Sequence, residues 1–297
     1  MTAETNPTEG TQPLIAAAWM MGAVAAFTLM AVAGREVSLE LDTFELLAYR
    51  SAIGIVIIGA IIVLRRDWQA ASFDHLGLHL TRNLIHFAAQ NFWFFAIFTI
   101  PLAQVFALEF TAPLWVLVLS PFFLGERLTR TRGIAAAAGF AGALMVAQPG
   151  AAPITPGLIS AALCAVGFAL TYIVTKRLTN VTSTLAILWW MVVMQTALGF
   201  IAAGIDGDIA LPSSQALPWL GILGITGLGA HFCIARALRV APATLVMPFD
   251  FLRLPVVAVV GMVLYDEPLG LAVILGAALI LGGNYFNVRA EAVRPRS

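Results

Sequence analysis

The stretch PLAQVFALEFTAPLWVLVLSPFFLGERLTRTRGIAAAAGFAGALMV at residues 101–146 returns later in the chain as PATLVMPFDFLRLPVVAVVGMVLYDEPLGLAVILGAALILGG at residues 242–283. The residues that align at an offset of 141 positions are Pro101 with Pro242, Glu109 with Asp250, Phe110 with Phe251, Glu126 with Glu267, Leu128 with Leu269 and Gly142 with Gly283. Near the start of the chain, Leu14-Ile15 matches Leu158-Ile159 at an offset of 144. A repeat of this length predicts two halves that share one fold.

The composition places both halves in a lipid bilayer. The 297 residues are 60% hydrophobic and 11% charged with a mean hydropathy of +0.92, whereas soluble domains carry about 25% charged residues. The formal net charge is zero, so no basic excess predicts a nucleic-acid partner. Cys164 and Cys233 lie in apolar runs without metal-ligand spacing, and we expect no disulfide framework, no metal site and no cofactor.

Ten apolar segments are long enough to cross the membrane, since about 20 residues span its hydrocarbon core as a helix. They are residues 14–33, 44–64, 78–99, 101–122, 132–149, 155–175, 183–204, 216–235, 241–264 and 268–288. The expected division is a tail at 1–13, a first repeat at 14–149, a second repeat at 155–288 and a tail at 289–297. The first segment resembles a signal peptide at Ala31-Val32-Ala33, but its apolar run is too long, and we expect it to be retained.

The positive residues between these segments predict the orientation. Twelve Lys and Arg residues fall on one side of the membrane and only Arg35 falls on the other. The positive-inside rule therefore predicts that both termini are cytoplasmic. Because five helices per half is an odd number, the two repeats are expected to be inverted. The predicted fold is an all-α membrane protein of ten helices, with two inverted five-helix repeats around a central cavity, which is an arrangement typical of secondary transporters.

Four ionisable residues inside the spans are costly to bury. Each ionised group at a helix centre costs about 2.5–3.5 kcal/mol on insertion scales, so each is expected to face the interior with a partner. Asp250 and Arg253 are three residues apart and can pair on one helix. Glu109 and Arg50 lack a local partner, and a bridge between them is a hypothesis. Glu109 and Asp250 are either a proton or substrate-ammonium site or members of structural ion pairs.

The segment at 78–99 carries a polar stripe. His79, Asn83, His86 and Gln90 follow a spacing of four, three and four residues, which places them on one helix face. In a bilayer that face is expected to turn toward a cavity or to bond a neighbouring helix. His231 is a further histidine in the same half of the membrane.

Three prolines lie in the repeat-equivalent segments 101–122 and 241–264. Pro113 interrupts the first, and Pro248 and Pro255 interrupt the second, because proline cannot donate a backbone hydrogen bond. They are predicted to act as hinges, and the alternative is a static bend around a cavity.

The whole pattern resembles the EamA type of the drug/metabolite transporter superfamily. The resemblance rests on the duplicated ten-helix layout, on the two long stretches quoted above and on Gly125-Glu126, of which only the glutamate is kept at Asp266-Glu267. It implies a bacterial inner-membrane exporter of small metabolites, with amino acids prominent. It also implies a cavity lined by the first, third, fourth, sixth, eighth and ninth spans, with the residues His79, Asn83, His86, Gln90, Trp115, Tyr172 and His231 as candidate lining.

The expected function is export of a neutral hydrophobic or aromatic amino acid, or a related metabolite, by alternating access. Protons are a candidate coupling ion, and the partners are the small-molecule substrate and the bilayer. The chain lacks a GxxxxGK motif, so an ATP-driven pump is not expected. A multidrug exporter of the same fold is the main alternative. A nucleotide-sugar antiporter, a channel and a membrane-embedded enzyme are less favoured, the last because no catalytic cluster is present.

Overall fold

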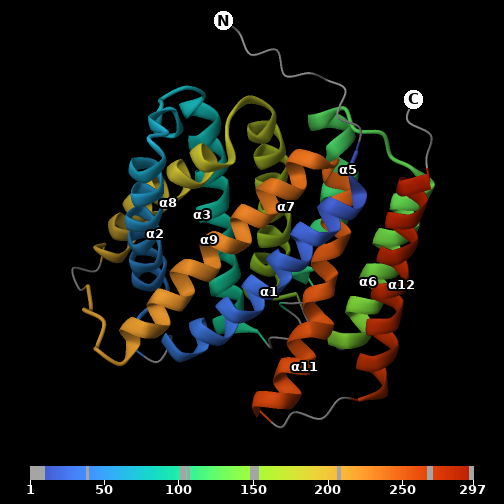
Figure 1. The fold of residues 1–297 in the computed structure, drawn as a ribbon. Coiled ribbons are helices and arrows are strands. Elements are labelled where there is room, and N and C mark those ends of the chain that lie inside the picture. The colour runs from blue at the N-terminus through green and yellow to red at the C-terminus, as the bar shows by residue number, and fades with distance from the viewer. Residues whose placement is uncertain are drawn as a thin grey trace, which may run out of the picture.

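The computed structural model describes residues 11–37, 40–100, 105, 108–147, 154–205, 209–265 and 270–293, and regular structure in these ranges is helical. The first repeat contains α1 (Pro13–Val37), α2 (Thr43–Arg65), the 3-10 helix η1 (Trp68–Ala71), α3 (Leu76–Thr99), α5 (Ala112–Leu124) and α6 (Arg130–Ala147). The second contains α7 (Pro156–Val181), α8 (Thr184–Ala203), α9 (Ala216–Val240), α10 (Ala243–Val246), the 3-10 helix η2 (Met247–Leu252), α11 (Arg253–Tyr265) and α12 (Leu271–Val293). Figure 1 shows them as one bundle.

Short polar residues set where several helices begin. Asp42 and Glu45 form a reciprocal capping box at the start of α2, in which each side chain accepts from the backbone N–H of the other. The hydroxyls of Thr155 and Ser183 cap α7 and α8 by a single bond each, accepting from the N–H of Leu158 and of Ala186, and Pro156 lies in the first turn of α7, where a missing N–H costs nothing. The predicted spans 44–64, 155–175 and 183–204 begin within one residue of these helices.

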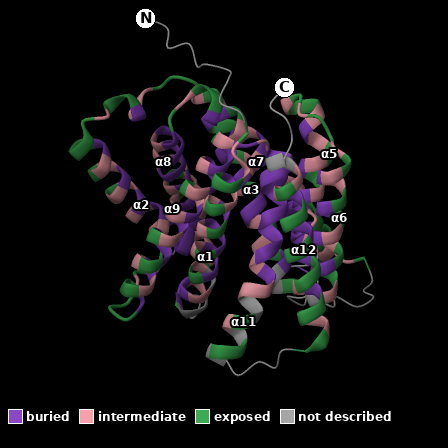
Figure 2. Cartoon of the chain, turned by 45° about the vertical axis from the view of Figure 1, so that its right-hand side comes forward, coloured by how far each residue is buried: buried purple, intermediate pink, exposed green. Residues whose placement is uncertain are grey.

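Six of the described helices are long and apolar enough to cross a membrane: α1, α2, α7, α8, α9 and α12. α3 has a similar length but carries the polar stripe of four residues predicted from the sequence. Exposed apolar side chains cover the outer faces of the bundle, while buried side chains gather between the helices (Figure 2). That distribution suits a chain surrounded by lipid.

The helices pair in a pattern that exchanges the two repeats. The most extensive packing joins α1 with α9, α3 with α7, α2 with α8 and α6 with α12. The equivalent helices of the two halves are α1 and α7, α2 and α8, α3 and α9, and α6 and α12. When each helix is replaced by its equivalent, the α1–α9 pair becomes the α7–α3 pair, while the α2–α8 and α6–α12 pairs stay the same. The bundle therefore has an approximate two-fold relation between its halves.

Equivalent helices run in opposite directions. The N–H of Gln12 donates to the carbonyl of Val240 (3.0 Å), which places the start of α1 beside the end of α9. Lys176, near the end of α7, donates to the carbonyls of Leu238 and Ala241 at that same end of the bundle. α1 therefore starts where α7 ends, as Figure 1 also shows.

The two proline-containing segments are interrupted rather than continuous. The expected span at 241–264, in which Pro248 and Pro255 predicted interruptions, divides into α10, the 3-10 helix η2 and α11. In the described part of 101–122, the chain turns at Phe110 and Thr111 before α5 begins. Pro113 and Pro248 lie in the first two positions of α5 and η2, and Pro255 lies in the first turn of α11. Each proline thus stands near the start of a segment.

Candidate functional site

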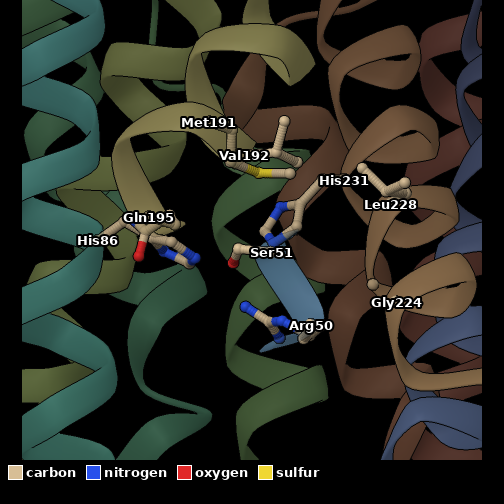
Figure 3. A pocket seen from close by; sticks show the side chains of 10 residues that line it. Arg50, Ser51, His86, Met191, Val192, Gln195, Gly224, Leu228 and His231 are labelled. Carbon is tan, nitrogen blue, oxygen red and sulfur yellow. The ribbon is translucent and has the colours of Figure 1, made fainter. Parts of the chain in front are cut away.

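A small cavity lies between α2, α3, α8 and α9. Its volume is about 20 Å³, which holds one water molecule and no metabolite. Its lining consists of Arg50, Ser51, His86, Met191, Val192, Gln195, Gly224, Gly227, Leu228 and His231. In Figure 3 the side chains of Arg50, His86, Gln195 and His231 point toward the same space from four helices. The helices must separate before a substrate can enter this space.

Arg50 reaches this cavity from α2. Its Nη1 lies 3.7 Å from Met30 Sδ, which is a weak acceptor. Gly227 of α9 lies beside this side chain, and a Cβ there would be in ordinary van der Waals contact with Arg50 Cδ at 3.5 Å. No carboxylate of the described residues pairs with Arg50. The guanidinium therefore retains unused donor capacity.

A second arginine lies nearby on α3 and was not singled out from the sequence. Arg82 is 2% exposed, and it donates to Asn83 Oδ1 (2.9 Å) and to Thr175 Oγ1 on α7 (3.4 Å). Gln195 Nε2 on α8 donates to the carbonyl of Asn83 (3.0 Å), which ties α8 to the same turn of α3. The available signal was an arginine inside the apolar segment 78–99, one residue before the polar stripe residue Asn83.

The histidines of the polar stripe occupy two places. His86 lies against His231 of α9 with the ring centroids 5.2 Å apart and nearly perpendicular. His79 lies nearer the start of α3, with its ring 6.2 Å from that of Trp190. The ring nitrogens of His79 and His86 are buried without a hydrogen-bond partner among the described residues. Only the His86–His231 pair borders the cavity.

A separate cluster of charges joins the two repeats. Arg253 Nη2 lies 2.5 Å from Glu109 Oε1 and 3.8 Å from Asp250 Oδ2, and the second contact joins the two residues whose spacing of three allows a pair on one helix. Trp93 Nε1 donates to the other oxygen of Glu109 (2.6 Å). The expected bridge from Glu109 to Arg50 is wrong, because Arg253 and Trp93 occupy both oxygens of this carboxylate. Phe27 and Phe110 lie against the guanidinium of Arg253, with ring centroids 5.3 and 4.9 Å from its Cζ.

The remaining candidate lining residues are dispersed. Tyr172 on α7 lies within electrostatic range of both charged regions, namely Asp250, Glu109 and Arg253 on one side and Arg82 on the other. Gln90 is buried on α3, and its Oε1 has no partner within the described ranges. Trp115 is 41% exposed on α5 and is not among the residues that line the cavity. Of the candidate residues, the structure therefore brings Arg50, His86 and His231 together at the cavity and Glu109, Asp250 and Arg253 together in the separate charge cluster.

Glu126 makes a contact between the repeats that its place in a motif did not predict. Its carboxylate accepts from the backbone N–H groups of Ala243 (2.8 Å) and Thr244 (3.0 Å) and from the Thr244 hydroxyl (2.8 Å), and thus caps α10. Arg132 donates to the same hydroxyl (2.9 Å). The repeat-equivalent Glu267, with Asp266, lies outside the described residues.

A bundle of apolar helices in two related halves, with charged residues buried between them, defines a membrane transport protein. The sequence profile of the EamA-like transporter family matches residues 14–148 and 155–289, and the chain belongs to that family. It is a multi-pass membrane protein that transports small molecules, and it is not an enzyme.

Curated relatives match over most of their length. A riboflavin transporter of Rhizobium johnstonii is 29% identical over 97% of this chain and 95% of its own. A riboflavin transporter of Vibrio cholerae is 27% identical over 96% of each chain, and an S-adenosylmethionine uptake transporter of Rickettsia prowazekii is 23% identical over 92% of each. A crystal structure of a protein that is 20% identical superposes with a TM-score of 0.81 over 93% of this chain and 97% of the other, which shows the shared fold.

Proposed function

We propose that this chain is a secondary transporter of a ring-containing metabolite rich in hydrogen-bond acceptors, with riboflavin as the leading candidate. The observation that carries this proposal is the polar lining of the cavity, where Arg50, Gln195 and Ser51 lie beside the His86–His231 pair. Riboflavin presents ring carbonyls and hydroxyls that suit such donors, and the imidazole rings offer faces for stacking. The relatives named for riboflavin support the same class of substrate.

The expected substrate, a neutral hydrophobic or aromatic amino acid, is the second candidate. Its carboxylate suits Arg50, but an apolar side chain gains little from a cavity with five polar lining residues. The relatives reported above are named for riboflavin and for S-adenosylmethionine, which combines an amino-acid group with a heteroaromatic ring. The substrate assay must therefore compare all three chemistries.

Transport is proposed to proceed by alternating access between the two inverted repeats. The cavity of about 20 Å³ is too small for a metabolite in the described conformation, so opening requires the helices of the two halves to move apart. Pro113, Pro248 and Pro255 stand near the starts of α5, η2 and α11, where a change in backbone angle does not break a continuous helix. We assign them as hinges, and we place the chain in a bacterial inner membrane with both termini in the cytoplasm.

Coupling to protons is proposed at Asp250. In the cluster of Glu109, Asp250 and Arg253, one guanidinium faces two carboxylates, which leaves one negative charge in excess. Glu109 is bound by Arg253 and Trp93, whereas the described partner of Asp250 is the 3.8 Å contact with Arg253. Asp250 is therefore the carboxylate that can accept a proton with the smaller loss of contacts. Tyr172 is the further titratable group that faces it.

Purified protein in liposomes tests this function directly. Uptake and release of labelled riboflavin, S-adenosylmethionine and phenylalanine are measured with and without an imposed pH gradient. Saturable riboflavin flux that unlabelled riboflavin competes, and that the gradient drives, is the expected result. Saturable flux of phenylalanine without riboflavin flux would replace the leading candidate by the second. Absence of flux for all three would contradict the proposed substrate class.

A further inference from the structure

Two arginines inside the bundle, the buried Arg82 on α3 and the half-buried Arg50 on α2, lie without an acidic partner among the described residues. Gln195 connects their surroundings, because it lines the cavity together with Arg50 and donates to Asn83, which also accepts from Arg82. Their described contacts are to the Met30 thioether, the Asn83 amide and the Thr175 hydroxyl, which are all neutral. No salt bridge in the described part of the chain involves either residue. Two like charges inside an apolar bundle are costly unless an opposite charge balances them.

Arg253 provides the contrast within the same bundle. It is paired with Glu109 and Asp250, as expected for an arginine that serves only to hold helices together. Arg50 and Arg82 lack such an arrangement although they are similarly enclosed. A structural role alone does not account for two like charges that no carboxylate balances.

The described groups around Arg50 and Arg82 add no carboxylate to balance their positive charge. The titratable groups near the pair are His79, His86 and His231, which add no negative charge, and Tyr172. Ser51 and Gln195 add neutral hydrogen-bonding groups at the cavity wall, and Gln195 Oε1 and the His86 ring nitrogens are buried without a described partner. Figure 3 shows Arg50 directed toward this group of side chains. A built polar site with excess positive charge faces the cavity.

We propose that Arg50 and Arg82 form a subsite for an anionic group, either a carboxylate or a phosphate, of a ring-containing metabolite. Riboflavin carries neither group, so the subsite favours an anionic relative of riboflavin over riboflavin itself as the bound ligand. A guanidinium presents parallel N–H donors that match two oxygens of such a group, and Arg50 reaches it directly from the cavity wall. Arg82 stabilises the bound charge from behind, through the field of its side chain. The inference rests on the proposed transport function for its location in the cycle, but binding itself is testable without transport.

Three pairs of compounds isolate the anionic group. Riboflavin 5′-phosphate and riboflavin differ by a phosphate, while S-adenosylmethionine and its decarboxylated form, and phenylalanine and phenethylamine, differ by a carboxylate. Binding of each compound to the purified full chain is measured by titration calorimetry. In at least one pair the anionic member is expected to bind at least tenfold more tightly, and the pair in which this occurs distinguishes phosphate from carboxylate.

Variants then assign the preference to the arginines. Arg50→Gln is expected to abolish the preference for the anionic member, and Arg50→Lys to retain part of it. Arg82→Gln is expected to weaken it without removing it. Arg289→Gln is the matched control, because this exposed arginine lies near the end of α12 and makes only a contact with the Tyr285 hydroxyl. Thermal unfolding of each variant shows whether it remains folded. If a variant does not fold, the compound pairs measured on the unsubstituted protein still test the anion preference.

Equal binding within every pair, or an unchanged preference in Arg50→Gln, would overturn the proposal. Failure of every anionic member to bind would overturn it as well. Anion-selective binding without riboflavin flux in liposomes would sustain the subsite and contradict the proposed riboflavin transport. Riboflavin flux with no selectivity for anions would support the proposed riboflavin transport and contradict the anion subsite.

Discussion

Glu109 and Asp250 occupy equivalent positions in the two repeats, yet both face the guanidinium of Arg253 in the second. The position in the first repeat that corresponds to Arg253 at the same offset is Ala112, so the duplication has become unequal at this point. Glu109 is bound by Arg253 and Trp93, whereas the described partner of Asp250 is Arg253 at 3.8 Å. Sequence equivalence therefore does not imply an equivalent role, and the two carboxylates are expected to respond differently to neutralisation.

Neutralising the carboxylates one at a time separates coupling from stability. Glu109→Gln removes the 2.5 Å ion pair to Arg253, and loss of one partner from a buried pair costs about 3–5 kcal/mol. We expect this variant to unfold at a markedly lower temperature. Asp250→Asn loses a weaker contact and should remain folded, but its flux should no longer respond to a pH gradient. Thermal unfolding in detergent and gradient-driven uptake in liposomes measure the two effects.

A reversed outcome would contradict this division of roles. If Asp250→Asn kept the response to the gradient while Glu109→Gln lost it without loss of stability, Glu109 would be the coupling carboxylate. Unchanged gradient dependence in both variants would exclude protonation of this cluster as the coupling step.

Local spacing predicted some of these contacts and missed others for a physical reason. The Asp250–Arg253 pair follows from a separation of three residues on a helix. The Glu109–Arg253 contact joins residues 144 positions apart, and only the packing of the repeats brings them together. Arg82 was not predicted as a site residue, although the sequence shows that it lies inside the apolar segment 78–99. The His86–His231 contact likewise depends on how α3 approaches α9.

Helix bounds follow the sequence closely where caps and apolar runs coincide. The predicted spans 44–64 and 183–204 differ from α2 and α8 by one residue at each end, because Asp42 and Ser183 cap those helices. The interruption at η2 was less predictable. Prolines indicated a break, but a six-residue 3-10 segment depends on buried tertiary contacts such as the bond from Asn284 Nδ2 to the carbonyl of Pro248 (3.2 Å).

Close approach of α6 and α12 depends on glycine at a repeat-equivalent position. A Cβ at Gly142 would lie 2.6 Å from the carbonyl oxygen of Gly276 and 2.7 Å from Ile280 Cγ1. Gly142→Ala is therefore expected to push the helices apart and to destabilise the bundle by about 1–3 kcal/mol, despite the better helix propensity of alanine. The midpoint of thermal unfolding should fall by several degrees.

Gly282→Ala on α12 is the matched control, since a Cβ there meets no atom within 4 Å. Its unfolding midpoint should stay the same or rise, because alanine favours a helix more than glycine does. Equal midpoints for the two variants would mean that α6 and α12 can separate without cost.

The arrangement of the whole bundle was more predictable than its binding site. Two halves with an odd number of spans require opposite directions for equivalent helices, and the contacts at the ends of α1, α7 and α9 agree with this direction. The cavity is set by side chains from α2, α3, α8 and α9, whereas the family resemblance implied spans that share only α3 and α9 with that set. A repeat predicts backbone topology, but a cavity depends on the conformation in which the helices have closed.

Cysteine labelling tests the orientation of this bundle in the membrane. Gln69 is exposed in η1, beside Arg65 and Arg66, at the end of the bundle rich in positive charge. Ser214 is exposed at the opposite end, next to Ser213, whose hydroxyl donates to Glu40 (2.9 Å). Because positive residues are retained in the cytoplasm, Ser214→Cys is expected to react with a membrane-impermeant maleimide on intact bacterial cells. Gln69→Cys should react only after the membrane is permeabilised.

The two substitutions belong in a chain in which Cys164 and Cys233 are replaced by alanine, so that no other thiol contributes signal. That background without either new cysteine is the control. Labelling of Gln69→Cys but not of Ser214→Cys on intact cells would invert the topology and would place Glu126 and its cap on α10 at the outer surface. With the expected result, the contact between the repeats that Glu126 makes with the start of α10 lies toward the cytoplasm. Any movement that separates the repeats at this end would release Ala243 and Thr244 from this carboxylate.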